Sequence, residues 1–263
     1  MIQGFMKGNI MKKFIKIAGI IVGSLVGILL LLCIFVPGLP TYFRVQKQYE
    51  YINSTVKPYP YSNVSAPDDY VTIECRGFSV KVPEDVQKLY PDETEGAKAG
   101  VYSDSEKDTT LMFLEPTVEA NFSLIDGNNP EDLTQEEFEK AMKGIKYKNP
   151  ENMYEFYDLL FNITPENFSV FRRKTPAVFN SLAEMKDVLY RAYSGNDIYS
   201  YETDNAIGFI SLYAQPNESN DRYSYLLELF EKDNLNAQHT IIIYANDLET
   251  VQKIANSAEL MEE

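Results

Sequence analysis

The chain has 263 residues, with 24 Lys and Arg against 39 Asp and Glu, and a formal net charge of −15 at pH 7. From residue 45 onward the imbalance grows to 19 basic against 39 acidic residues, a net charge of −20. This charge argues against nucleic acid as a partner, because phosphates need a basic surface, and it opposes broad contact with anionic lipids.

Residues 17–36 are the first predicted element, a transmembrane helix. They contain no charged residue, and twenty residues at about 1.5 Å each match a hydrocarbon core about 30 Å thick. Four lysines precede them, whereas the first acidic residue is Glu50. Since lysine in short flanks stays on the cytoplasmic side, we expect residues 1–16 in the cytoplasm, a single pass through the cell membrane, and the C-terminal domain outside.

Three other interpretations of this segment compete with an anchor. A cleaved signal peptide normally has an apolar region of about 7 to 15 residues that ends in small residues, which fits residues 17–36 poorly. A lipoprotein signal is expected to have a small residue before its cysteine, whereas Leu32 precedes Cys33. A buried helix of a soluble domain would contain more polar residues than the single Ser24.

Gly19, Gly23 and Gly27 recur every four residues within the predicted helix. Small residues at this spacing form a ridge that lets two helix backbones approach closely in lipid. The pattern predicts self-association or pairing with another membrane helix, although glycine is also simply common in membrane helices.

Residues 37–69 are predicted to be a juxtamembrane linker, because Pro58, Pro60 and Pro67 among Ser and Asn favour an extended chain. Tyr42, Phe43 and Arg44 follow the predicted anchor. Aromatic rings and a long basic side chain suit the outer headgroup layer of a membrane.

A folded domain is predicted for residues 70–263, and it begins with strands. Four strands are expected, over residues 71–75, 78–82, 100–103 and 109–114. In the first two, apolar and polar residues alternate, and Arg76 and Gly77 form the turn between them. Pro83 is expected to open a short helical segment.

Residues 131–195 are predicted to be a helical insertion. Thr134 and Glu137 have the spacing of a capping box, and apolar residues follow at helical intervals. Three later Asn-Pro or Thr-Pro pairs suit helix starts, since the first helical amide needs no partner. The polar residues 126–132 just before are expected to form a turn and a helix start rather than a calcium loop.

Strands and helices are expected to alternate in the last part of the chain. The expected order is strands over 198–202 and 206–213, a helix over 223–230, a strand over 239–245 and a helix capped by Asn246 and Glu249. The helix over 223–230 is predicted because apolar residues from Tyr223 to Phe230 recur at helical spacing. The whole predicts an α+β fold, a mainly antiparallel sheet flanked by helices and preceded by one transmembrane helix.

Two segments of the chain resemble the PsbP-like fold family, which includes bacterial DcrB-type envelope proteins. The first is Gly77-Phe78-Ser79-Val80-Lys81-Val82-Pro83, similar to the family's opening strand. The second is Thr240-Ile241-Ile242-Ile243-Tyr244 with the helix after it, similar to the closing strand and helix. The resemblance covers the outer thirds of the domain. It implies an accessory or binding role and transfers no catalytic residue.

No motif in the sequence specifies a catalytic, cofactor-binding or metal site. His239 is the only histidine and begins an apolar strand, where an edge or core position is expected. Cys75 alternates with apolar residues and is expected to be an inert core thiol, and one His and one Cys do not make a zinc site. We therefore expect no cofactor. Carboxylates are plentiful, which leaves an Asp/Glu-dependent extracytoplasmic hydrolase as an alternative.

Arg172, Arg173 and Lys174 form the one basic cluster of the acidic domain. They are candidates for contact with an anionic partner, whereas a solvated helix end is the simpler interpretation. The leading hypothesis is a membrane-anchored binding or accessory protein without catalysis, whose extracytoplasmic protein or ligand partner is unknown. Besides the hydrolase, a structural subunit of a membrane complex, assembled through the glycine ridge, is the other alternative.

Overall fold

The computed structural model describes residues 24, 26–28, 31–32, 34–36, 38–89, 99–106, 108–117, 122–126, 129–168, 177–193, 197–214 and 222–261. Its helices are α2 (Leu39–Gln48), α3 (Gln135–Ala141), α4 (Met153–Asn162), α5 (Ala177–Ala192), α6 (Leu248–Asn256) and the 3-10 helix η1 (Pro165–Asn167). Its strands are β1 (Lys57–Pro58), β2 (Val71–Cys75), β3 (Phe78–Val82), β4 (Gln87–Lys88), β5 (Ala99–Ser103), β6 (Thr109–Leu114), β7 (Phe122–Asp126), β8 (Asn129–Leu133), β9 (Ile198–Glu202), β10 (Ala206–Ala214), β11 (Tyr223–Glu231), β12 (Gln238–Ala245) and β13 (Glu259–Leu260).

An eight-stranded sheet forms the centre of the fold, with the order β1-β9-β10-β11-β12-β6-β5-β4. Its pairs are antiparallel except β1 with β9, which is parallel. A smaller sheet has the order β13-β3-β2, and β7 pairs with β8 alone. The fold is therefore α+β with a mainly antiparallel sheet, as predicted.

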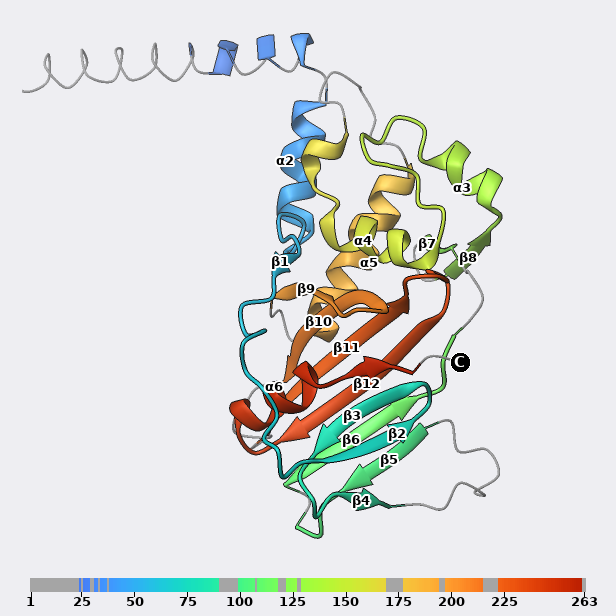
Figure 1. The fold of residues 1–263 in the computed structure, drawn as a ribbon. Coiled ribbons are helices and arrows are strands. Elements are labelled where there is room, and N and C mark those ends of the chain that lie inside the picture. The colour runs from blue at the N-terminus through green and yellow to red at the C-terminus, as the bar shows by residue number, and fades with distance from the viewer. Residues whose placement is uncertain are drawn as a thin grey trace, which may run out of the picture.

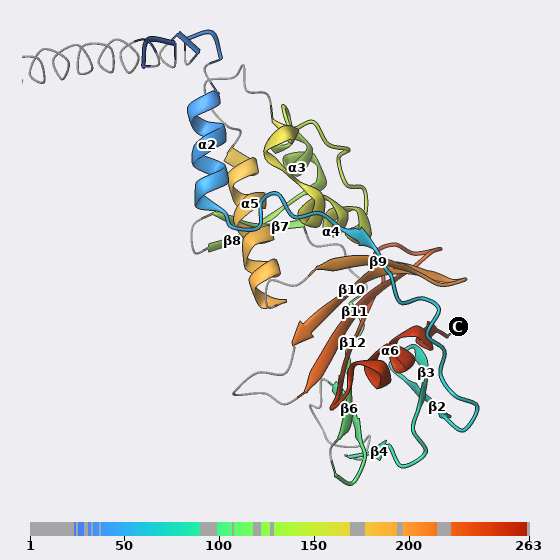
Figure 2. The same ribbon diagram turned by 90° about the vertical axis from the view of Figure 1, so that its left-hand side faces the viewer.

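Each face of the central sheet packs against its own hydrophobic core (Figures 1 and 2). Leu226 and Phe230 of β11 join a core built with α4 and α5. Leu227 and Leu229, on the opposite face because successive side chains alternate, join a core built with α6 and β3. The predicted central position of β12 is confirmed, since it lies between β11 and β6.

The predicted helix over residues 223–230 is wrong, because this segment is the strand β11. Tyr225 to Phe230 are all buried, on both faces of the strand. A strand covered on both faces is apolar at nearly every position, so it can match helical spacing by coincidence. Of the polar residues 126–132, expected to be a turn and helix start, Asp126 ends β7 and residues 129–132 lie in β8, which pairs with β7.

Capping patterns locate some helix starts better than others, since α4 begins at Met153 with Asn152 as its N-cap, three residues after the predicted start at Asn149-Pro150. Thr134 and Glu137 form the predicted capping box of α3, and α3, α4 and α5 all lie within the predicted helical insertion. The final helix begins one residue later than expected, because Asp247 rather than Asn246 accepts the hydrogen bond from the amide of Thr250. The segment after Pro83 contains the short strand β4 instead of a helix.

The predicted linker, residues 37–69, contains α2 and β1 and contributes three buried side chains, Val45, Tyr49 and Ile52. No helix among the residues described above has the length and apolar character needed to cross a bilayer. Part of the predicted span 17–36 lies outside those residues.

Candidate functional site

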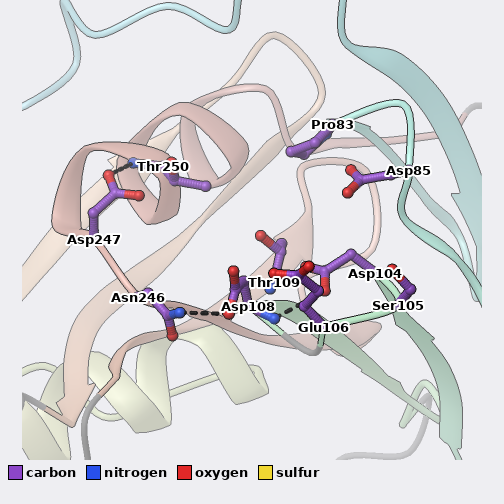
Figure 3. A pocket seen from close by; sticks show the side chains of 10 residues that line it. All are labelled: Pro83, Asp85, Asp104, Ser105, Glu106, Asp108, Thr109, Asn246, Asp247 and Thr250. Atoms are coloured by element: carbon purple, nitrogen blue, oxygen red, sulfur yellow. Dashed lines mark hydrogen bonds between the residues drawn. The ribbon is translucent and has the colours of Figure 1, made fainter.

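An open pocket of about 330 Å³ lies where three loops meet beside α6 (Figure 3). Its lining residues are Pro83, Asp85, Asp104, Ser105, Glu106, Asp108, Thr109, Asn246, Asp247 and Thr250. Half of them are acidic, so the pocket is strongly negative. Figure 1 shows α6 and β4–β6 at the end of the molecule remote from α2, so the pocket and α2 occupy opposite ends.

The turn between β5 and β6 is held together by Asp104. This side chain is buried, and its two carboxylate oxygens accept hydrogen bonds from the amides of Asp108, at 2.9 Å, and Thr109. The hydroxyl of Ser103 donates to the carbonyl of Thr109 at 2.9 Å. A buried carboxylate is stable only when such bonds replace its hydration. Asp104 therefore has a structural role in the turn.

The opposite wall of the pocket is the start of α6. Asn246 Nδ2 donates to Asp108 Oδ1 at 2.6 Å and joins this wall to the β5–β6 turn. Asp247 Oδ1 accepts from the amide of Thr250 at 2.8 Å and caps the helix. Three of the five pocket carboxylates thus accept hydrogen bonds that shape the pocket, and the exposed Asp85 and Glu106 add to its negative charge.

The negative charge of the pocket favours a cationic ligand or a basic protein segment. Within the described parts of the chain, no group of three or more His, Cys, Asp or Glu side chains is arranged to hold a metal ion. Basic groups are attracted to a negative concave surface, but attraction alone activates no nucleophile.

Among the carboxylates that the structure describes, Glu228 has the pKa most shifted by its surroundings, and it lies in the core rather than in the pocket. Burial raises its pKa to about 7. Tyr193, the residue after α5, donates to Oε2 at 3.0 Å, and Gln238 donates to Oε1 at 3.3 Å. The hydrolase alternative requires two acids that converge in a concave site; Glu228 is instead bonded to a tyrosine and an amide between sheet and helix.

His239 fastens the β2–β3 hairpin to the central sheet. Its buried ring places Nε2 2.8 Å from Glu231 Oε1 and Nδ1 3.2 Å from the carbonyl oxygen of Arg76. Gly77 has a φ of +82°, and a Cβ there would lie 2.7 Å from the ring, so the close approach needs glycine. The structure therefore gives His239 a packing position.

Residues 49–64, hereafter the belt, are bound along the side of the domain rather than extended in solvent (Figure 2). The buried Lys186 of α5 donates from Nζ to the carbonyls of Ile52, Ser54 and Ile163. Next to it, Asp187 Oδ1 accepts from the amide of Tyr51 at 3.2 Å. Three carbonyl oxygens match the three protons of an ammonium group, while burial lowers the pKa of Lys186 to about 7.

Further contacts hold the rest of the belt. The amide of Val56 donates to Asn162 Oδ1 at 2.9 Å, and β1 adds to the edge of the sheet beside β9. Tyr59 packs edge-on against Tyr199, Tyr201 and Tyr225. Finally, Asn256 Nδ2 donates to the carbonyls of Tyr61 at 2.6 Å and Val64 at 2.7 Å.

The site residues predicted from sequence fall largely outside the described residues. Gly19 and Gly23 lie there, as do Arg172, Arg173 and Lys174. Gly27 is described, and a Cβ built on it meets nothing within 4 Å. Cys75 is half-buried, with its Sγ directed at Gly100 of β5.

Sequence reasoning missed Lys186 and Glu228, although each had a signal. Lys186 falls four residues after Leu182, on the apolar stripe of α5, and Glu228 interrupts an apolar run. A charged residue at a core position of a regular pattern indicates a buried, partnered group. Asp104 and Asn246 had no such signal, because the contact between their loops depends on tertiary structure.

No family model matches the chain, and no curated protein matches it. Its structure is similar to the solution structure of cyanobacterial PsbP (CyanoP) from Synechocystis sp. PCC 6803, with a TM-score of 0.35 and 9% sequence identity. The match covers 74% of this chain and 95% of that chain. It agrees with the resemblance predicted from the sequence, at the level of the fold, and supports no statement about function.

Proposed function

We propose that this protein is a single-pass membrane protein whose extracytoplasmic domain binds a partner without catalysis, and that the belt holds this domain in a fixed position relative to its anchor. The belt carries the proposal. A flexible linker would let the domain move freely, whereas these residues are bound to α5, β9 and α6.

The side chains before α2 support the anchor. Leu31, Ile34 and Phe35 are 55%, 71% and 73% exposed, so the folded domain does not cover them. Consecutive large apolar side chains are costly in water, at about 25 cal/mol for each Å² exposed, and lipid would remove that cost. The four N-terminal lysines supply the expected cytoplasmic flank.

Labelling with a membrane-impermeant maleimide tests the topology in intact cells. The two native cysteines, Cys33 and Cys75, are first changed to serine. Glu84→Cys, at an exposed position of the domain, should be labelled in intact cells, and the matched Lys7→Cys only after permeabilisation. Labelling of Lys7→Cys in intact cells, or recovery of the protein in the soluble fraction, would contradict the proposal.

Photocrosslinking of the full chain in cells tests the binding role. Ser105, on the exposed rim of the acidic pocket, and Val188, an exposed residue of α5, are equivalent surface positions at different parts of the domain. A photoreactive residue at position 105 should capture one defined partner that position 188 does not. Equal capture at both positions would indicate random contact and refute a specific binding surface at the pocket.

A further inference from the structure

The helix α2 has one face on the domain and one face free of it. Val45 and Tyr49 are buried, and Tyr42 packs against Phe168 with ring centroids 6.3 Å apart. Pro40, Phe43, Arg44 and Lys47 are all exposed. Their spacing of three, four and seven residues places these four on one side of a helix. The outward face of α2 is therefore one aromatic ring, one proline and two cations.

This face differs in charge from the rest of the domain. Phe43 is 57% exposed, and no ion pair between described residues includes Arg44 or Lys47. No acidic residue precedes Glu50, while the chain from residue 45 onward carries a net charge of −20. The two cations thus lie at the end of the domain nearest the predicted anchor, opposite the acidic pocket (Figure 1).

We propose that the outward face of α2 lies on the membrane surface and binds anionic lipid headgroups through Arg44 and Lys47, with Phe43 in the interfacial layer. The inference rests on the proposed anchor, since residue 36 ends the predicted span and Phe43 follows seven residues later. Aromatic rings favour the interface, and basic side chains are attracted to anionic headgroups.

The charge of the remaining domain makes this contact selective. An acidic surface is repelled by anionic lipid, whereas the two cations on the outward face of α2 are attracted to it. Because Tyr42 and Val45 tie α2 to the domain, a membrane that binds the outward face of α2 also sets the orientation of the domain.

A single tryptophan can test the contact, because the chain contains none. Phe43→Trp in the full chain, reconstituted into vesicles of phosphatidylcholine with phosphatidylglycerol, should show blue-shifted emission that brominated lipids quench. The matched control is Val71→Trp, at a 38% exposed position of β2, whose emission brominated lipids should leave unchanged. In pure phosphatidylcholine vesicles the quenching of Phe43→Trp should decrease.

The variant Arg44→Gln/Lys47→Gln, combined with Phe43→Trp, should lose the difference between anionic and neutral vesicles. Vesicle flotation of every variant separates the two proposals. If the protein floats with vesicles but Phe43→Trp is not quenched, or is quenched equally with and without anionic lipid, the lipid contact of α2 is refuted and the anchor stands. If the protein does not float after carbonate washing, the anchor is refuted, and the α2 contact with it.

Discussion

The two faces of the central sheet are stabilised by different chemistry. The face covered by α4 and α5 packs aromatic rings around buried ionisable groups, Lys186 and Glu228. The face covered by α6 and β3 is built mainly from Val, Ile, Leu and Ala. Burial of apolar area depends little on pH, whereas a buried ionisable group makes stability pH-dependent. Lys186 and Glu228 should therefore make stability on the α5 side pH-dependent, whereas the aliphatic core around α6 should contribute about equally at every pH.

The largest effect should come from Gly208→Ala, which disrupts both faces together. A Cβ at Gly208 would lie 1.9 Å from the carbonyl oxygen of Glu228, a backbone atom of the neighbouring strand. Relief requires β10 and β11 to separate, so we expect a loss of about 3 kcal/mol or more in the free energy of unfolding, measured by chemical denaturation of the full chain in detergent.

Gly100→Ala is the matched control for this prediction. Its Cβ would meet the side-chain Sγ of Cys75 at 2.5 Å rather than backbone. The loss should be smaller, and Cys75→Ala should restore part of it. Equal losses at Gly208 and Gly100 would show that β10 and β11 can separate as easily as a side chain can move.

Lys186→Met should remove a pH dependence from the α5 side. Burial lowers the lysine pKa from 10.5 to about 7, so between these values the unfolded chain binds more protons than the folded chain. Stability of the native protein should therefore decrease as pH falls from 10.5 to 7, by about 1 kcal/mol per unit at most. Chemical denaturation at pH 7, 8 and 9 measures the free energy of unfolding of the native protein and of Lys186→Met. If the two proteins differ by the same amount at all three pH values, burial does not lower the pKa of Lys186.

The same substitution should also loosen the belt. Methionine cannot donate to the carbonyls of Ile52, Ser54 and Ile163, so limited proteolysis within residues 49–56 should become faster. Lys232→Met, at a partly exposed ion pair with Glu202, should leave that cleavage rate unchanged.

Glu228→Gln should give the opposite pH signature. Burial raises the carboxyl pKa from 4.5 to about 7, so the folded chain binds more protons in this range and native stability falls as pH rises from 4.5 to 7. An amide keeps the size and can still accept from Tyr193. Above pH 7 the free energy of unfolding of Glu228→Gln should therefore exceed that of the native protein by about 1 kcal/mol or more. The control Glu74→Gln, at an exposed position of β2, should leave the free energy of unfolding unchanged at every pH.

The smallest effect is expected on the α6 side. Asp247→Ala removes the side-chain oxygen that caps α6 and should cost about 1 kcal/mol, equally at pH 5 and pH 8. Asp247→Asn keeps a capping oxygen and should be close to the native protein in thermal unfolding. A strong pH dependence of the Asp247→Ala effect would weaken the contrast between the two faces.

Local patterns predicted much of this fold, and tertiary burial explains where they failed. Alternation identified β2 and β3, and a capping box located α3, because these signals depend on neighbours in sequence. The segment from Tyr223 to Glu231 was wrongly predicted as a helix. Both faces of this strand are buried, so it lacks the alternation of polar and apolar residues that identifies a strand with one exposed face. The contacts of the belt also could not be predicted from its prolines. The residues that bind it, such as Asn256, lie up to 195 residues later in the chain.

The candidate site depended even more on tertiary structure. The three loops of the acidic pocket come from residues 83–85, 104–109 and 246–250, and no local pattern places them together. The buried Lys186 and Glu228 could have been anticipated, because a charge on a core stripe needs partners wherever the chain supplies them.

The belt also constrains the order in which the molecule can be completed during synthesis. Tyr51 bonds to a side chain 136 residues later, and Tyr61 to one 195 residues later. These N-terminal residues leave the ribosome first and must wait for α5 and then α6 before their partners exist. Contacts of such long sequence separation form slowly because loop closure costs entropy. The segment nearest the anchor should therefore be the last to become fixed, when the final helix has been made.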